Sequence, residues 1–354
     1  MLRIAGQSDF IFHDSDQPMG DRNSKVRPYD KAISSFSAAL QANADRNIAF
    51  LIYSLRAAAY LGKGQLDKAL VDSSESIQLN PKYAPAYYCR GIVYSRTANT
   101  DKAISDYTAA IQLNPRDIGV YLNRAVEYSN KRNYKLALRD ATMAIQLNPK
   151  YADAYHNRAI YYGELGEFEK AIADYSKAIQ FNPRSVTLCY RATAYEDIEK
   201  FNNAIADYDR VIRITPKDAD DYSVRGSAYF AKGNYKDALS AFEKAVQLSP
   251  KDASALDGLA WFRASCPDAS LRNGKEGIRM SIKACELTEW KEPATISTLA
   301  AAYAETGDFD QAVKYQTQAI NMASEYGPVL KEERERLALY RDHKPWRRKP
   351  LSAR

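Results

Sequence analysis

Six arginines recur along the chain at almost equal spacing, and five aspartates follow them at a constant distance. The arginines are Arg56, Arg90, Arg124, Arg158, Arg191 and Arg225. Sixteen residues after each of the first five stands an aspartate, namely Asp72, Asp106, Asp140, Asp174 and Asp207. A guanidinium with free N–H groups binds phosphate or carboxylate ligands, whereas one that faces an aspartate of its own chain forms a salt bridge. A pair that returns with every unit favours the structural interpretation, and anion binding is the alternative.

The pattern also has exceptions that bear on its meaning. Arg225 has Ala241, and no aspartate, sixteen residues later. Further along the chain, Leu259 and Leu299 take the place of the arginine. The pair is therefore predicted for five units.

A proline returns with the same period after an apolar helical pattern, at Pro81, Pro115, Pro149, Pro183, Pro216 and Pro250. The intervals are 34, 34, 34, 33 and 34 residues. Within one period, Tyr121, Ala125 and Tyr128 and then Ala137 and Ala141 are spaced by three, four or seven residues, as on one side of a helix. Each period is therefore predicted to hold two helices, and a fixed period of this length indicates a stacked array.

An aromatic residue at position four of each unit, a small residue at eight, Tyr at eleven, Ala at twenty and Pro at thirty-two resemble the tetratricopeptide repeat family. The resemblance covers residues 50–322 and implies an all-α fold, a right-handed α-solenoid (superhelix) of stacked helix–turn–helix hairpins. About eight repeats are expected, with units starting near residues 50, 84, 118, 152, 185, 219, 253 and 293. The closing units and the LALYRDHKPWR ending look like a block of bacterial proteins of this family, so a bacterial source is expected.

The segments outside the array are predicted from their composition and pattern. Residues 1–28 show no periodicity and are expected to be mobile, whereas 29–49 hold a capping helix, the second half of a repeat. After the array we expect a C-terminal capping helix over 323–341 and then a free basic tail over 342–354. Residues 331–354 carry nine Lys and Arg against four Asp and Glu.

The family resemblance also implies a concave groove lined by first-helix positions two, five, nine, twelve and thirteen. Asparagine amides near these positions would bond the backbone of an extended peptide, and carboxylates further along would favour a basic segment. The apolar members of the row would alternatively only pack between successive first helices. The candidate partner-binding residues are Tyr88, Ile92, Leu122, Asn123, Val126, His156, Asn157, Ile160, Glu164, Glu196 and Asp197.

Chemistry of other kinds has little support in the sequence. The three histidines, His13, His156 and His343, have no neighbours at metal-ligand spacing, and no glycine-rich phosphate loop follows a strand pattern. We therefore expect no metal site, no cofactor and no enzyme activity. Four dispersed cysteines, no signal-peptide pattern and no apolar run of membrane-spanning length favour a cytoplasmic protein.

The function expected from these observations is that of a scaffold or adaptor that binds a peptide or domain partner in the concave groove. One alternative is association with nucleic acid or an anionic membrane through Arg341, Lys344, Arg347, Arg348 and Lys349 around Trp346. Another is a subunit that only locates a separate enzyme. The sequence carries no signal for the partner's identity or for an oligomeric state.

Overall fold

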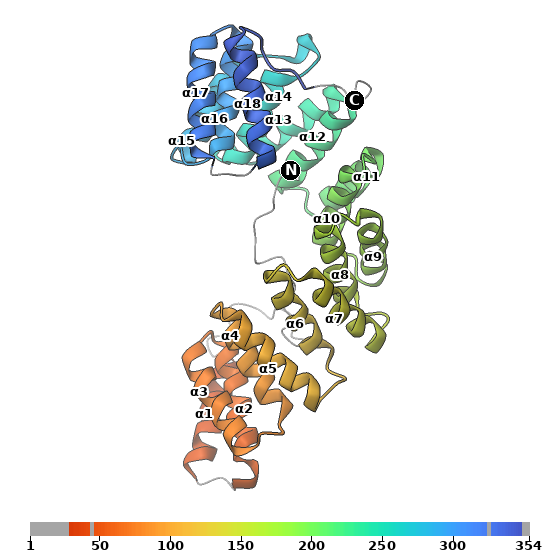
Figure 1. The fold of residues 1–354 in the computed structure, drawn as a ribbon, viewed down its shortest axis with the longest axis vertical. Coiled ribbons are helices and arrows are strands. Elements are labelled where there is room, and N and C mark those ends of the chain that lie inside the picture. Colours follow the sequence, from red (N-terminus) through yellow and green to blue (C-terminus); the bar gives the residue numbers. More distant parts are fainter. Residues whose placement is uncertain (1–27, 43–45, 324–326, 349–354) are drawn as a thin grey trace. The chain divides into compact units, whose positions relative to one another are not determined.

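The computed structural model describes residues 28–42, 46–323 and 327–348. These residues form eighteen α-helices and one 3-10 helix, and they contain no strand (Figure 1). The chain divides into two compact units, residues 1–183 (the first half) and 184–354 (the second half). The N-terminal segment predicted to be mobile lies outside the described residues, apart from Pro28, where the first helix begins.

Consecutive helices pack in pairs in both halves, as expected for an α-solenoid of helical hairpins. The first half contains α1 (Pro28–Gln41), α2 (Arg46–Gly62), α3 (Leu66–Leu79), α4 (Ala84–Arg96), α5 (Thr100–Leu113), α6 (Ile118–Asn130), α7 (Tyr134–Leu147), α8 (Ala152–Glu164) and α9 (Phe168–Phe181). The second half contains α10 (Ser185–Asp197), α11 (Phe201–Ile214), α12 (Ala219–Lys232), α13 (Tyr235–Leu248), α14 (Ala253–Ser265), η1 (Ala269–Leu271), α15 (Gly274–Leu287), α16 (Pro293–Thr306), α17 (Phe309–Met322) and α18 (Gly327–Arg341).

The first helix of each hairpin from α4 to α16 begins at the residue predicted to open its unit. Only the first unit differs, because α2 begins at Arg46, four residues before the predicted start at Phe50. The extra residues in the turn of the seventh unit form η1 between α14 and α15. The repeat pattern in the sequence therefore determines where each of these hairpins begins.

The recurring proline ends the second helix and fixes the start of the next hairpin. After α7, Asn148 has an extended backbone. Pro149 follows it, and the proline ring disfavours a helical conformation at the residue before it, so the helix ends here. The Pro149 carbonyl then accepts a hydrogen bond from the Tyr155 hydroxyl, at 3.1 Å. Tyr87, Tyr121 and Tyr222 donate to their preceding prolines in the same way. The six-residue spacing of proline and tyrosine thus joins one hairpin to the next.

Small residues allow the two helices of a hairpin to approach closely. Ala125 on α6 and Ala137 and Ala141 on α7 are fully buried. In the second unit the corresponding small residue is Gly91, and a Cβ there would come 2.6 Å from the buried ring of Tyr107. The glycine is therefore required by its aromatic neighbour and not by its backbone conformation.

Replacing Gly91 by valine is expected to lower the free energy of unfolding by about 2 kcal/mol, because the added carbons overlap a ring that is fully buried. Gly163 offers a matched control, since it also lies in a first helix and a Cβ there would meet nothing within 4 Å. Urea denaturation of both variants measures the effect. Equal stability of Gly91→Val and Gly163→Val would contradict the packing argument.

The C-terminal tail differs from the expectation. Residues 344–348 follow α18 without helical structure and pack on the array instead of extending freely into solvent. Trp346 lies with its ring centroid 5.1 Å from that of Trp261 on α14, and Arg347 forms an ion pair with Glu305 on α16. The prediction of a free basic tail is therefore wrong for these residues, and 349–354 lie outside the described part of the chain.

Candidate binding surfaces

The five predicted arginine–aspartate pairs are all formed, each across the two helices of one hairpin. Their shortest nitrogen–oxygen distances lie between 2.6 and 2.8 Å. In the third unit, Arg124 Nε donates to Asp140 Oδ2 at 2.7 Å and Nη2 donates to Oδ1 at 2.9 Å. The side chains of Arg124 and Asp140 are only 8% and 1% exposed. The pair is thus bidentate and almost completely removed from water.

The remaining nitrogen of several arginines bonds to the preceding hairpin. Arg124 Nη1 donates to Thr108 Oγ1 at 3.0 Å, and Arg158 Nη1 donates to Thr142 Oγ1 at 3.2 Å. Arg56 Nη1 makes a comparable contact with Ser37 Oγ on α1, so α1 takes the place that the second helix of the preceding hairpin has in later units. Arg225, which has no aspartate sixteen residues later, pairs with Asp209 of the preceding unit at 2.8 Å. We call these contacts between consecutive hairpins the arginine staples.

The tyrosines of the repeat cover the same guanidinium groups. The Arg124 guanidinium lies 5.9 Å from the ring centroid of Tyr121 and 5.7 Å from that of Tyr128, one on each side along α6. Arg158 is flanked in the same way, and hydrogen bonds to Asp174 raise its pKa against the opposing effect of burial. Donors and ring faces are thus used within the array, so these arginines hold the hairpins together and offer no open anion site.

The candidate groove residues of the first half come from α4, α6 and α8. Asn123 Nδ2 donates to the Tyr88 hydroxyl at 3.0 Å, which links α6 to α4. Ile92 is partly exposed. Of the candidates on α6 and α8, Glu164 is exposed and the others are buried, namely Leu122, Asn123, Val126, His156, Asn157 and Ile160. The structure therefore groups these residues along three successive first helices but leaves few of them open to solvent.

A glutamate that the sequence reasoning missed lies among them. Glu127 on α6 is 1% exposed, and its Oε1 accepts a hydrogen bond from Ser95 Oγ of α4 at 2.5 Å. Its position in the repeat is occupied by Ala59 and Val93 in the two preceding units. A carboxylate at a position that is otherwise apolar was the signal that would have identified it.

Several polar atoms in this group have no hydrogen-bond partner. They are the acceptors Asn123 Oδ1, Glu127 Oε2 and Asn157 Oδ1 and the donor Asn157 Nδ2, and all four are buried. Buried polar groups in folded proteins are nearly always paired, because an unpaired one retains its full desolvation cost. We call Ser95, Asn123, Glu127 and Asn157 the polar strip.

The predicted acidic residues divide between the two halves. Glu164 belongs to the first half, where its Oε2 accepts a hydrogen bond from Tyr134 at 2.9 Å. Glu196 and Asp197 end α10 in the second half. Burial raises the pKa of Glu196 to about 7, so near neutral pH this carboxyl exists in both charged and uncharged forms.

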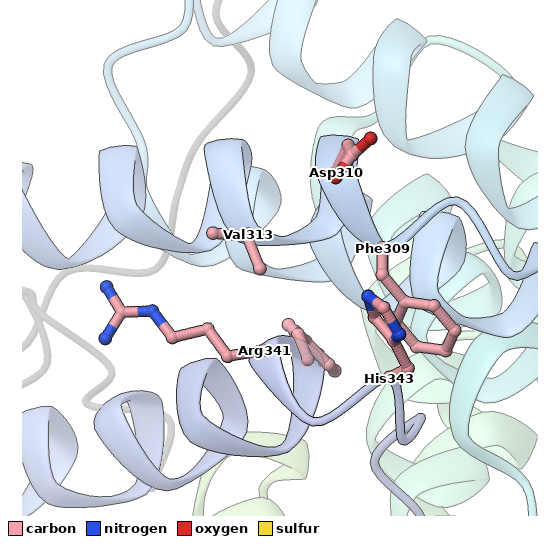
Figure 2. Close-up of a pocket in the computed structure, with 6 residues that line it drawn as sticks. Phe309, Asp310, Val313, Arg341 and His343 are labelled. Carbon is pink, nitrogen blue, oxygen red and sulfur yellow. The ribbon is translucent and has the colours of Figure 1, made fainter.

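A shallow hollow of about 280 Å³ lies between α17 and the end of α18. Figure 2 shows Phe309, Asp310 and Val313 on one side and Arg341 and His343 on the other. The His343 ring lies 5.2 Å from that of Phe309, whereas no ion pair or hydrogen bond joins Asp310 to Arg341 or His343 in the described structure. The hollow thus brings polar groups near one another without the linked hydrogen bonds of a nucleophile and its base.

Residues 28–42, 46–323 and 327–348 contain no group of three His, Cys, Asp or Glu side chains that could hold a metal ion. None of the helices built from these residues has the length and apolar character needed to cross a membrane.

The comparison with family models matches five separate stretches of the chain to the tetratricopeptide repeat. The matched residues are 84–117, 152–185, 188–218, 219–252 and 296–326. They coincide with hairpins that begin at α4, α8, α10, α12 and α16. The comparison with curated proteins finds no match.

Solved structures show the same fold at low sequence identity. A tetratricopeptide repeat protein from Parabacteroides merdae is 18% identical, with a TM-score of 0.54 over 83% of this chain and 99% of its own. The C-terminal part of a TPR repeat-containing protein from Cytophaga hutchinsonii is 20% identical, with a TM-score of 0.54 over 65% of this chain and 94% of its own. With its repeat period, its hairpins and these matches, the chain belongs to the tetratricopeptide repeat family.

Proposed function

We propose that the first half of this protein binds an extended segment of a partner protein along the polar strip. Tetratricopeptide repeat proteins in general bind protein or peptide partners, which supports a scaffold role for the chain. The observation that carries the finer proposal is the set of unpaired buried atoms on Asn123, Glu127 and Asn157. A bound segment would supply their missing partners.

The chemistry of these atoms indicates what the partner segment carries. Three of the four unpaired atoms are acceptors, and one of them belongs to the carboxylate of Glu127. The complement is a segment that offers backbone N–H groups together with a Lys or Arg side chain. Because the side chains of Asn123, Glu127 and Asn157 are buried, the groups that cover them must move aside when the partner segment binds.

A set of synthetic extended peptides, with net charges that range from negative to positive, tests this proposal. Wild-type protein should retain basic peptides, and Glu127→Gln or the pair Asn123→Ala/Asn157→Ala should weaken their binding at least tenfold. The pair Gln112→Ala/Gln146→Ala, on exposed positions of the second helices α5 and α7, is the matched control. Retention that is independent of peptide charge, or that all variants share, would place binding elsewhere.

The sequence also leaves two alternative functions open. Association with nucleic acid or an anionic membrane through Arg347 would require this residue to leave its ion pair with Glu305. A subunit that locates a separate enzyme needs a binding surface of the same kind and is compatible with the proposal. A cytoplasmic location also remains a proposal, supported by the four free cysteines, of which Cys89, Cys266 and Cys285 are buried.

A further inference from the structure

Residues 346–348, which follow α18, lie on three successive first helices of the second half. Residues 346–348 contact Phe230 on α12, Trp261 on α14 and Glu305 on α16. In the repeat these three residues take positions twelve, nine and thirteen, which the family resemblance assigns to the groove. The chain's own terminal segment therefore occupies the place of a ligand.

The aromatic part of this contact is a pair of indole rings with a cation above it. The rings of Trp346 and Trp261 are inclined by 36° with centroids 5.1 Å apart. The guanidinium of Arg336, on α18, lies 4.6 Å from the Trp261 centroid and 5.1 Å from that of Trp346. Arg336 is itself held by Glu332 and Glu333, so Trp261 and Arg336 form a fixed receptor for one indole.

The basic part of the contact uses a carboxylate that is positioned by another residue. Glu305 forms an ion pair with Arg347, and its other oxygen accepts from Arg272 Nε at 2.9 Å. Arg272 in turn donates to the Cys266 carbonyl at 2.8 Å, within the extra residues of the seventh unit. The inserted turn thus orients Glu305 toward an arriving guanidinium.

The last described residue completes the contact. The Arg348 guanidinium lies 4.8 Å from the ring centroid of Phe230, and its backbone N–H donates to the Ser265 carbonyl at 3.3 Å. Ser265 ends α14, where helical carbonyls have no partner within the helix. The receptor atoms thus belong to α12, α14, α16, α18 and the turn after α14, whereas residues 345–348 are half-buried and have no regular structure.

We propose that Phe230, Trp261 and Glu305 form a recognition surface for a protein segment in which a tryptophan is followed by two arginines. Trp346–Arg348 is its resident occupant, and a partner with the same chemistry binds by displacing it. This surface consists of other residues than the polar strip, and its test is independent of the one given there.

The test compares the full chain with a chain that ends at His343, which keeps Arg336 and the whole receptor. The probe is a fluorescent peptide of residues 342–354, and its binding is followed by anisotropy. A resident segment on a short tether has an effective concentration of about 1 mM. If the shortened chain binds the peptide with a Kd of about 10 μM, the full chain should bind it about 100-fold more weakly.

Three protein variants and one peptide variant make the result specific. Glu305→Gln in the shortened chain should weaken peptide binding at least tenfold, whereas Glu286→Gln, on an exposed position of α15, should leave it unchanged. A peptide with Trp346 replaced by alanine should bind at least tenfold more weakly. Arg347→Ala in the full chain weakens the resident segment and should increase affinity for the wild-type peptide.

The Arg347→Ala variant keeps the experiment decisive if the shortened chain does not fold, which circular dichroism would reveal. If neither the folded shortened chain nor Arg347→Ala binds the peptide at 1 mM, the terminal segment is a fixed part of the fold and the proposal is wrong. Binding that Glu305→Gln and Glu286→Gln change equally would also overturn it.

Discussion

Replacing Arg124 by alanine is expected to lower the free energy of unfolding by about 3–5 kcal/mol, because the Asp140 carboxylate then remains buried without its counter-charge. Thr108 of the preceding hairpin loses its bond to the same guanidinium. Chemical denaturation followed by circular dichroism measures the change. An unchanged midpoint would show that the pair contributes no stability.

Two further variants separate the buried pair from charge in general. Arg139 also approaches Asp140, at 3.5 Å, but it is 58% exposed, so Arg139→Ala should cost about 1 kcal/mol or less. The double variant Arg124→Leu/Asp140→Met copies Leu259 and Met280, which take the equivalent places in the seventh unit. It should recover most of the loss, since a buried ion pair can be exchanged for apolar groups of similar volume.

Asp257 on α14 is expected to make the stability of the protein depend on pH. Its Oδ1 atom is buried without a hydrogen-bond partner, and burial raises the pKa of this carboxyl to about 6 although a hydrogen bond from Thr298 opposes the shift. In the unfolded chain the Asp257 carboxyl has its ordinary pKa of about 4, so between about pH 4 and 6 the folded state keeps a proton that the unfolded state has lost. Stability therefore falls as the pH rises from about 4 to 6 and then stays level.

The variant Asp257→Asn imitates the protonated carboxyl and should remove this part of the pH dependence. Its melting temperature should equal that of the wild type near pH 4 and exceed it above pH 6, where the difference in unfolding free energy reaches at most about 3 kcal/mol. Asp237→Asn, at an exposed position of α13, should follow the wild-type profile. A constant difference between Asp257→Asn and wild type at every pH would contradict the assignment.

The hairpins and the arginine pairs could be predicted because the same residues return in each unit. One period shows which positions face each other, and the neighbouring periods repeat the same information. The start of α2 at Arg46 was missed because no preceding unit supplies the register there. The tyrosines around Arg124 were recognised as repeat positions, but their contact with the guanidinium depends on side-chain direction along α6.

The surfaces could be predicted less well because they depend on departures from the repeat. Glu127 occurs once at its position, and no periodic argument draws attention to it. The tail was missed for a different reason, since a run of basic residues at a chain end usually remains in solvent. Its contacts with Trp261 and Glu305 join residues 85 and 42 positions apart, which the local pattern does not reveal.

The arginine staples have a consequence for how such a chain can change length. Arg124 donates to Thr108, and Arg158 donates to Thr142, so the second and third hairpins each present a threonine hydroxyl at the same position to the hairpin that follows. Loss of residues 118–151 as a block would bring Thr108 in front of Arg158 and would leave the Arg158 guanidinium with a threonine hydroxyl as its acceptor. Recombination between these units can therefore remove one hairpin without a compensating mutation at this contact, which makes the number of hairpins an evolutionary variable separate from their sequence.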